Sequence, residues 1–160
     1  MKGLLVLAAL VAFAAADCNT MARLKVKEQW HHVYGTGGNR IMGGRVVWRA
    51  MFAHDPESRE LFKGVGGDDI NSADFAAHSI RVMGALEMAV DLLDHEDVLE
   101  LALAHLKEQH DPRNIARSHI RNFKEVLMTA VPASLGRCFD ADAWSSCLDV
   151  IGRGIFGAAH

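Results

Sequence analysis

Apolar residues recur every three or four positions along most of the sequence, and this spacing restricts the fold more than any other feature. Between residues 75 and 93, one face of a single helix would carry Phe75, Val82, Leu86, Val90 and Leu93. The alternation of apolar and polar residues that marks a half-buried strand appears nowhere in the sequence. We therefore expect an all-α chain whose helices each bury one apolar stripe in a shared core.

Glycine and proline residues divide the sequence into seven expected helical segments with short joints. The first is capped by Asn19 or Thr20 and has its apolar positions at Met21, Leu24, Trp30 and Val33. The others run from about residue 39 to 55, 56 to 62, 71 to 93, 96 to 110, 113 to 131 and 140 to 157. Because Asp111 precedes a proline, we expect it to leave the helical conformation and to end the fifth segment.

The first sixteen residues predict a secretory signal peptide. Lys2 is soon followed by the apolar run LLVLAALVAFAAA, which is too short to span a bilayer and has small residues at Ala14 and Ala16. A buried core helix is the alternative interpretation of this run. With cleavage after Ala16, residues 17–160 form one domain, and no second apolar stretch is long enough to cross a membrane. We expect a secreted, extracellular chain.

Charge and cysteine content narrow the possible partners. The net charge is −3, from 17 basic and 20 acidic residues. No basic patch with interleaved aromatic residues is present, so we expect no nucleic-acid partner. The three cysteines are Cys18, Cys138 and Cys147. An odd number leaves one thiol over in an oxidising compartment.

Two histidines close together in the sequence face different directions on the expected helix. Leu99, Leu103, Leu106 and His110 are spaced by four, three and four residues and so share one stripe. His105 lies about 100° around the helix from Leu106 and faces the polar flank. His110 is therefore the inward-facing residue of the two.

A second inward-facing histidine is expected at His78, which lies on the apolar face of another helix, one turn before Val82. A core histidine bonded to a backbone carbonyl is the alternative for each residue. No pair of histidines has the spacing of zinc ligands on one helix, and no HExxH motif occurs. Two imidazoles lining one apolar cavity fit haem iron instead, which takes an axial histidine.

Ten residues in order resemble a globin, and specifically an extracellular globin chain of an annelid giant haemoglobin. They are Trp30, Trp48, Phe52, Pro56, Phe62, His78, Val82, Leu106, His110 and Ile115. The resemblance covers residues 17–160. It implies the globin fold, with seven to eight helices around a pocket for haem b (iron protoporphyrin IX).

The resemblance also implies a role for each matching residue. His110 corresponds to the proximal iron ligand, and His78 to the distal histidine that donates a hydrogen bond to oxygen. Phe62 stacks on the haem, Val82 lies on the distal side, and the residues that flank the proximal side are Leu106 and Ile115. Trp48 occupies a position where annelid chains often have tryptophan. Three roles remain open for it: a second donor to the ligand, a partner of His78, or a large core residue.

The cysteines match the same family. Cys18 and Cys147 correspond to the pair that joins the N-terminal segment to the last helix, which leaves Cys138 as a candidate for an interchain disulfide. The partners implied are molecular oxygen, other globin chains and linker subunits of a large assembly.

The resemblance implies reversible oxygen transport rather than enzymatic activity. A haem enzyme, such as a peroxidase or a nitric-oxide dioxygenase, is the alternative. Two further alternatives are electron transfer with His78 and His110 both on iron, and a helical interaction protein without haem.

Overall fold

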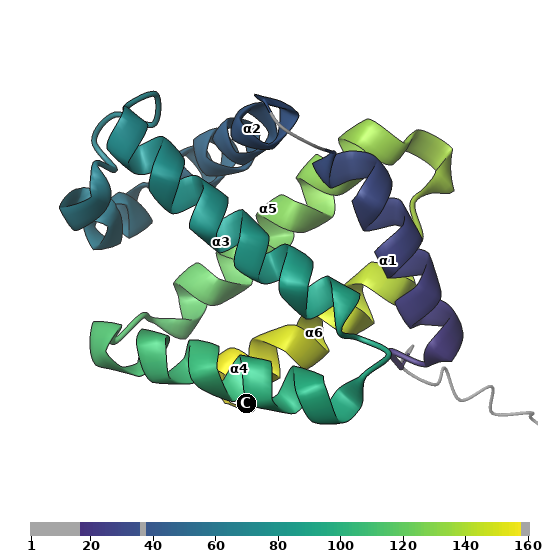
Figure 1. Cartoon of the computed structure of the whole chain (residues 1–160). Helices are drawn as coiled ribbons and strands as arrows, with labels where there is room; N and C mark the ends of the chain where they lie inside the picture. Colours follow the sequence, from purple (N-terminus) through teal and green to yellow (C-terminus); the bar gives the residue numbers. More distant parts are fainter. Residues whose placement is uncertain (1–16, 36–37, 158–160) are drawn as a thin grey trace, which may run out of the picture.

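The computed structural model describes residues 17–35 and 38–157, and within them every regular element is helical, which confirms the all-α prediction. There are six α-helices and one long 3-10 helix, with two short 3-10 turns (Figure 1). Their bounds are α1 Thr20–Tyr34, α2 Gly38–His54, η1 Pro56–Val65, α3 Ala73–Asp91, α4 Glu96–His110, η2 Asp111–Arg113, α5 Arg117–Leu135, η3 Gly136–Cys138 and α6 Ala141–Phe156. The expected signal peptide, residues 1–16, lies outside the described residues.

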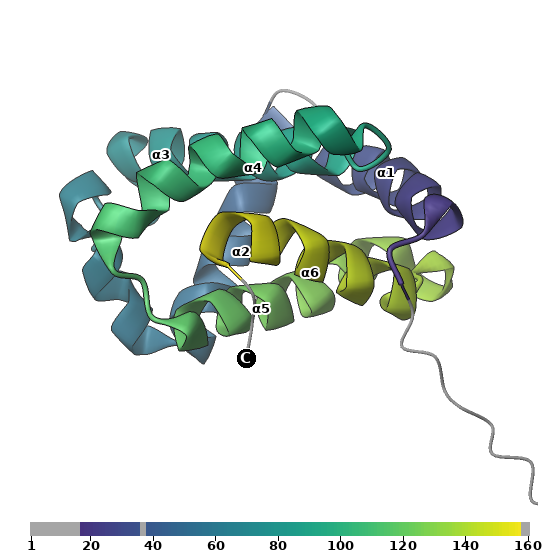
Figure 2. The ribbon, with the colours of Figure 1, turned by 90° about the horizontal axis from the view of Figure 1, so that it is seen from below.

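The helices form two layers around one core. Seen from below, α1, α3 and α4 lie in one layer over α5 and α6, with α2 behind (Figure 2). Helices α3 and α4 are joined by a short turn at one end and diverge toward η1 and η2 at the other (Figure 1). The most deeply buried large side chains include Trp30, Phe75 and Trp144. Among the described residues, no helix has the length and apolar character needed to cross a membrane.

Helix α1 buries only part of the expected set of apolar residues, since Trp30 and Val33 pack on the core but Met21 and Leu24 do not. Its N-cap is Asn19, as predicted, whose side chain accepts hydrogen bonds from two backbone N–H groups. The buried residues are Ala22, Val26, Trp30 and Tyr34, whereas Met21 and Leu24 are exposed. The prediction for Met21 and Leu24 was therefore wrong. The four buried residues are spaced by four positions, so they share one face of the helix, and this face packs on the core. Met21 and Leu24 lie outside this row.

The chain continues through a helical turn after α4 instead of leaving the helical conformation. Asp111 has φ −51° and ψ −45°, so the prediction that Pro112 would force it out of this region was wrong. Proline fits the start of the 3-10 turn η2, where its missing N–H leaves no gap in the helix. The chain reverses at Asn114, which has a φ of 47°. Helix α5 consequently starts at Arg117, four residues later than expected, and continues through Pro132.

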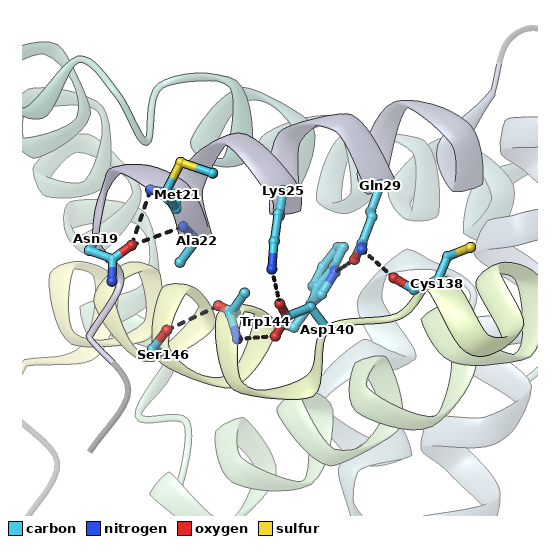
Figure 3. Close-up of polar contacts among 10 residues, drawn as sticks. Asn19, Met21, Ala22, Lys25, Gln29, Cys138, Asp140, Trp144 and Ser146 are labelled. Carbon is cyan, nitrogen blue, oxygen red and sulfur yellow. Dashed lines mark hydrogen bonds and ion pairs between the residues drawn. The ribbon is translucent and has the colours of Figure 1, made fainter. Parts of the chain in front are cut away.

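A disulfide joins the N-terminal segment to the last helix, and hydrogen bonds, which Figure 3 shows, join the first helix to the last. Cys18 and Cys147 form a disulfide with a Cα–Cα distance of 4.8 Å, which confirms the predicted pair. The Trp144 indole donates to Oε1 of Gln29 at 2.7 Å, and Nε2 of Gln29 donates to the carbonyl oxygen of Cys138 at 2.6 Å. These contacts hold the N-terminal segment and the last helix in one fixed register.

Helices α2 and α3 cross closely at Gly44. A Cβ atom at this position would lie 2.2 Å from the Ser79 hydroxyl oxygen, so a larger residue would force this serine to move. The close crossing brings Trp48, one turn further along α2, against the first half of α3.

Candidate functional site

One hydrogen bond determines which nitrogen of His110 is available to a ligand. Nδ1 lies 2.7 Å from the carbonyl oxygen of Leu106, one turn back on α4. Because a carbonyl can only accept, Nδ1 carries the hydrogen and Nε2 of the neutral ring keeps its lone pair. The imidazole also meets the Phe156 ring edge to face, with the ring centroids 5.1 Å apart. His110 is thus oriented as a ligand through Nε2.

A cavity of about 130 Å³ lies beside His110. Its apolar lining is Ile115, Ile120 and Phe156, and its polar rim comes from η2 and the start of α5. Pockets that enclose drug-sized ligands usually measure about 300–1,000 Å³. A porphyrin therefore fits here only if neighbouring side chains move apart.

His78 lies on α3 in a group of aromatic rings. Its ring centroid is 5.5 Å from that of Phe62 and 6.0 Å from those of Trp48 and Phe75. Its Nε2 atom is buried and has no hydrogen-bond partner within the described part of the chain. Burial lowers the pKa of His78, and the nearby Arg81 and Arg113 lower it further. His78 is therefore neutral at neutral pH, and one ring nitrogen carries a hydrogen that it can donate.

Trp48 is buried at the centre of the same group. Its ring packs against Phe62 at 4.7 Å, Phe75 at 5.4 Å and Phe123 at 5.7 Å between centroids. The indole Nε1 has no hydrogen-bond partner among the described residues, so it does not bond His78 here. Of the three roles left open for Trp48, the second donor and the core residue remain.

The predicted site residues form two groups, one around His78 and one around His110. Trp48, Phe62 and His78 form the group on α2, η1 and α3, which we call the distal group, and Val82 is half-buried one turn after His78. Leu106, His110 and Ile115 form the second group, at the end of α4 and before α5, which we call the proximal group. The elements that carry the two groups, η1 with the start of α3 and the end of α4 with η2, lie where α3 and α4 are furthest apart (Figures 1 and 2).

Sequence reasoning missed the residues that hold η1 against α5. Asp55 is buried and accepts hydrogen bonds from Nδ1 of His119 at 2.5 Å and from Asn122 at 3.0 Å. Its carboxylate also accepts from the Ser58 backbone N–H. His119 is 64 positions from Asp55, so only the tertiary fold brings them together. Phe156 was missed for the same reason.

A second and larger hollow, of about 430 Å³, lies next to Cys138. It is lined by charged groups, including Lys25, Arg137, Asp140 and Asp142. Charged walls do not suit a largely apolar porphyrin, so this hollow is not the haem site. Cys138 itself is an exposed free thiol.

The donor set of the two groups fits haem. His110 offers an oriented lone pair on Nε2, and His78 offers a buried nitrogen without a protein partner. Aromatic and aliphatic side chains surround both imidazoles, and Arg81 and Arg113 supply positive charge near His78. A planar, apolar group that carries two carboxylates and an iron atom matches these features.

Comparison with known proteins gives the same result. The globin family model matches residues 45–155. The chain is 44% identical to extracellular globin-2 of Lumbricus terrestris, over 88% of this chain and 97% of that protein. It is 43% identical to an extracellular monomeric globin of Tubifex tubifex, over 90% of this chain and 99% of that protein. It is 37% identical to extracellular globin-1 of Lumbricus terrestris, over 87% and 98%.

The match covers the elements that carry both groups, and the identity to extracellular globins extends over nearly the whole chain. The chain belongs to the globin family.

Proposed function

We propose that residues 17–160 form a secreted globin domain that holds haem b between α3 and α4 and binds oxygen reversibly. Membership of the globin family supports haem binding. The names of the relatives, which are extracellular globins, support secretion after removal of residues 1–16. The proposed role is oxygen transport, rather than a peroxidase or nitric-oxide dioxygenase activity.

The observation that carries this proposal is the state of the two imidazoles. Nδ1 of His110 is committed to the Leu106 carbonyl, so its Nε2 is free, and Nε2 of His78 is buried without a partner. A buried polar atom without a partner costs about 1–3 kcal/mol, so such an atom is usually satisfied by a ligand, an ion or water. A ligand placed between the two helices would satisfy both nitrogens.

Bound haem would supply an iron atom that coordinates oxygen reversibly. His110 holds the group from the proximal side, and the hydrogen bond to Leu106 strengthens the imidazole as a ligand. His78 stands on the distal side as a neutral donor, because burial and the two arginines keep it from taking a second proton. Val82 and Phe62 exclude water from the distal side.

Other residues would contact the proximal face and the carboxylates of the haem. Leu106 and Ile115 give the proximal side its apolar surface. Arg81 and Arg113 both lower the pKa of His78, so they place positive charge near the distal group, and guanidinium groups pair readily with carboxylates. We propose these two arginines as the propionate partners.

We also propose that the chain assembles with other globin chains and with linker subunits. Cys138 supports this, because it is exposed and free while the other two cysteines are joined. An exposed thiol in an oxidising fluid tends to form a disulfide with a partner.

The test is retention of haem by two histidine variants. His110→Ala removes the proposed iron ligand and should lose haem during gel filtration. His105→Ala is the matched control, because His105 is exposed on the same helix and its ring hydrogen-bonds to the nearby Gln109. The absorption of each fraction, before and after dithionite and oxygen, reports the haem. A His110→Ala protein that keeps its haem as the parent does would refute the proposal.

A further inference from the structure

Two helices expose pairs of neighbouring apolar side chains. On α2, Met42 is 57% exposed and Val46 is 54% exposed, one turn apart. On α4, Val98 is 47% exposed and Leu101 is 74% exposed, three residues apart. Single exposed apolar residues are normal on protein surfaces, but adjacent pairs on one helix face form a patch. We call these the α2 patch and the α4 patch.

The charges around the two patches are of opposite sign. Helix α2 contains three arginines and no carboxylate, and two of them, Arg45 and Arg49, lie within four residues of Val46. Helix α4 contains four carboxylates, Glu96, Asp97, Glu100 and Glu108, against one lysine, Lys107. The chain therefore offers a basic apolar patch on one helix and an acidic apolar patch on another.

These charges have few ionic partners of their own. Lys107 pairs with Asp111, and Glu96 pairs with Arg23. Within residues 17–35 and 38–157, Arg45 and Arg49 form no salt bridge, and neither do the carboxylates of α4 that flank Leu101. Arg45 does hydrogen-bond to the Asn71 carbonyl oxygen at 3.3 Å, but this neutral acceptor leaves its charge without an ionic partner. Within the described residues, the charges of both patches are therefore not neutralised.

A third exposed apolar pair, Met21 and Leu24 on α1, lacks this property. The cations beside it are already engaged within the chain: Arg23 with Glu96, Lys25 with Asp140, and Lys27 with Asp94. This pair offers apolar surface without free charge.

We propose that the α2 patch of one copy of this chain docks on the α4 patch of a second copy. Burial of the four apolar side chains supplies attraction, and the opposite charges set the orientation and exclude like-charged surfaces. The two helices lie on opposite sides of the molecule: α2 is at the top of Figure 1 with α4 along the bottom, and Figure 2 shows α4 in front with α2 behind. One copy can therefore bind two neighbours, and the contact is head-to-tail rather than two-fold.

This contact deepens the proposed assembly of globin chains, because it names a surface and a partner. It uses neither His78 nor His110, so its failure leaves the proposed haem binding untouched. Charge pairs at a surface are screened by salt, and the contact should weaken as ionic strength rises.

The experiment is sedimentation velocity on the haem-loaded chain, over a concentration series that reaches the millimolar range. Every protein carries Cys138→Ser, so that no disulfide links the copies. Val46→Glu places a carboxylate against the acidic α4 patch of the partner, and Leu101→Gln removes the most exposed apolar side chain of the α4 patch without adding charge. Each should raise the dissociation constant at least about tenfold. Met88→Glu is the matched control, because Met88 is an exposed apolar residue of α3 outside both patches. It should associate as the parent does.

A mixture of the two patch variants gives the decisive result. The Val46→Glu chain keeps an unchanged α4 patch, and the Leu101→Gln chain keeps an unchanged α2 patch. Head-to-tail docking predicts that an equimolar mixture forms a one-to-one dimer that does not grow further. A mixture that stays monomeric, variants that associate like the parent, or a parent that is monomeric throughout the series would overturn the proposal. Haem absorbance in the same runs reports pocket occupancy separately.

Discussion

His78 and Trp48 each bring a buried nitrogen that no described residue satisfies. Their rings lie 6.0 Å apart between centroids, so both can face one small ligand. Each nitrogen is costly to bury without a partner, and a ligand that accepts hydrogen bonds relieves this cost. The distal group is therefore suited to a ligand that carries partial negative charge, such as oxygen on ferrous haem.

We predict that His78→Val raises the oxygen dissociation rate roughly ten- to hundredfold, because a hydrogen bond to a charged group contributes about 1.5–3 kcal/mol. Stopped-flow measurement on the ferrous protein gives this rate directly. Loss of the hydrogen bond from His78 to bound oxygen should also speed oxidation of the iron, so the variant should form ferric haem faster than the parent.

The matched comparison for this prediction is Trp48→Phe, which keeps the aromatic packing and removes the indole N–H. An oxygen dissociation rate that rises in both variants would assign two donors. A rise in Trp48→Phe alone would show that His78 does not supply the hydrogen bond.

At the residue scale, the sequence was sufficient to predict which way a side chain faces when that depends on the spacing within one helix. The spacing of Leu99, Leu103 and Leu106 predicted that His110 faces inward and His105 outward, and the structure agrees. The hydrogen bond between His119 and Asp55 could not be predicted, because nothing local relates residues on different elements. The distal group required the resemblance to globins for the same reason.

Close packing of α6 against α4 supports the helix that carries the proximal group. A Cβ atom on Gly154 of α6 would lie 2.4 Å from Cδ1 of Leu103 and 2.9 Å from its Cβ. Because Leu103 is buried on α4, it cannot move away without disturbing the core. Gly154 therefore allows the two helices to approach closely.

We predict opposite effects for two glycine substitutions on α6. Gly154→Ala should destabilise the fold by about 1–3 kcal/mol, because it overpacks the contact with Leu103. Gly152→Ala meets nothing within 4 Å, and it should stabilise the fold by about 0.5–1 kcal/mol through helix propensity. Urea unfolding followed by circular dichroism measures both. Equal effects of the two substitutions would contradict the close contact.

The link between η1 and α5 should give the fold a dependence on acid pH. Burial by itself raises the pKa of Asp55, but hydrogen bonds from His119 and Asn122, with the charge of His119 and the Ser58 N–H, outweigh it and leave the pKa below its ordinary value. A lowered pKa means that the ionised carboxylate stabilises the fold at neutral pH. This stabilisation is lost as pH falls below about 4 and the carboxylate takes up a proton.

We predict that Asp55→Asn lowers the free energy of unfolding at pH 7 by about 1–3 kcal/mol, since the charged acceptor is lost. The difference from the parent should narrow as the pH falls below about 4. Denaturant unfolding at pH 7 and at pH 3.5 tests both parts. The control is Asp149→Asn, which breaks a partly exposed surface pair with Lys124 and should change stability by less than about 0.5 kcal/mol. A constant difference across this range would contradict the prediction.

The limits of helices were predictable where the local signals agree, and unpredictable where packing decides. The bounds of α4 match the expected range of 96 to 110, because the leucine spacing marks an inward stripe that ends at His110. The expected effect of Pro112 on Asp111 played no part, since Asp111 stays helical. Helix α5 passes through Pro132, although proline normally interrupts a helix. Burial of Val131 and packing of Leu135 against the core favour this continuation. No local pattern in the sequence contains that information.

At the scale of the whole molecule, Cys138 is the residue that we propose links this chain covalently to others. It lies in the turn between α5 and α6, beside the hollow lined by Lys25 and Arg137, and it is exposed. The relatives do not indicate one outcome, because one of them is named a monomeric globin.

We predict that the native protein migrates as a covalent multimer on a non-reducing denaturing gel. Either reductant or Cys138→Ser should reduce it to a single chain, and the variant should keep the disulfide between Cys18 and Cys147. A native protein that already migrates as one chain would show that Cys138 is capped or remains a free thiol.

The disulfide between Cys18 and Cys147 has one more consequence. It joins positions 129 residues apart, so residues 18–147 lie inside one closed covalent loop. A single proteolytic cut at any peptide bond between these two cysteines opens the loop but releases no fragment. The turn between η1 and α3, for example, can be cut while both halves remain attached to each other. After such a cut, residues 18–147 come apart only if the disulfide is reduced or a second cut is made within the loop.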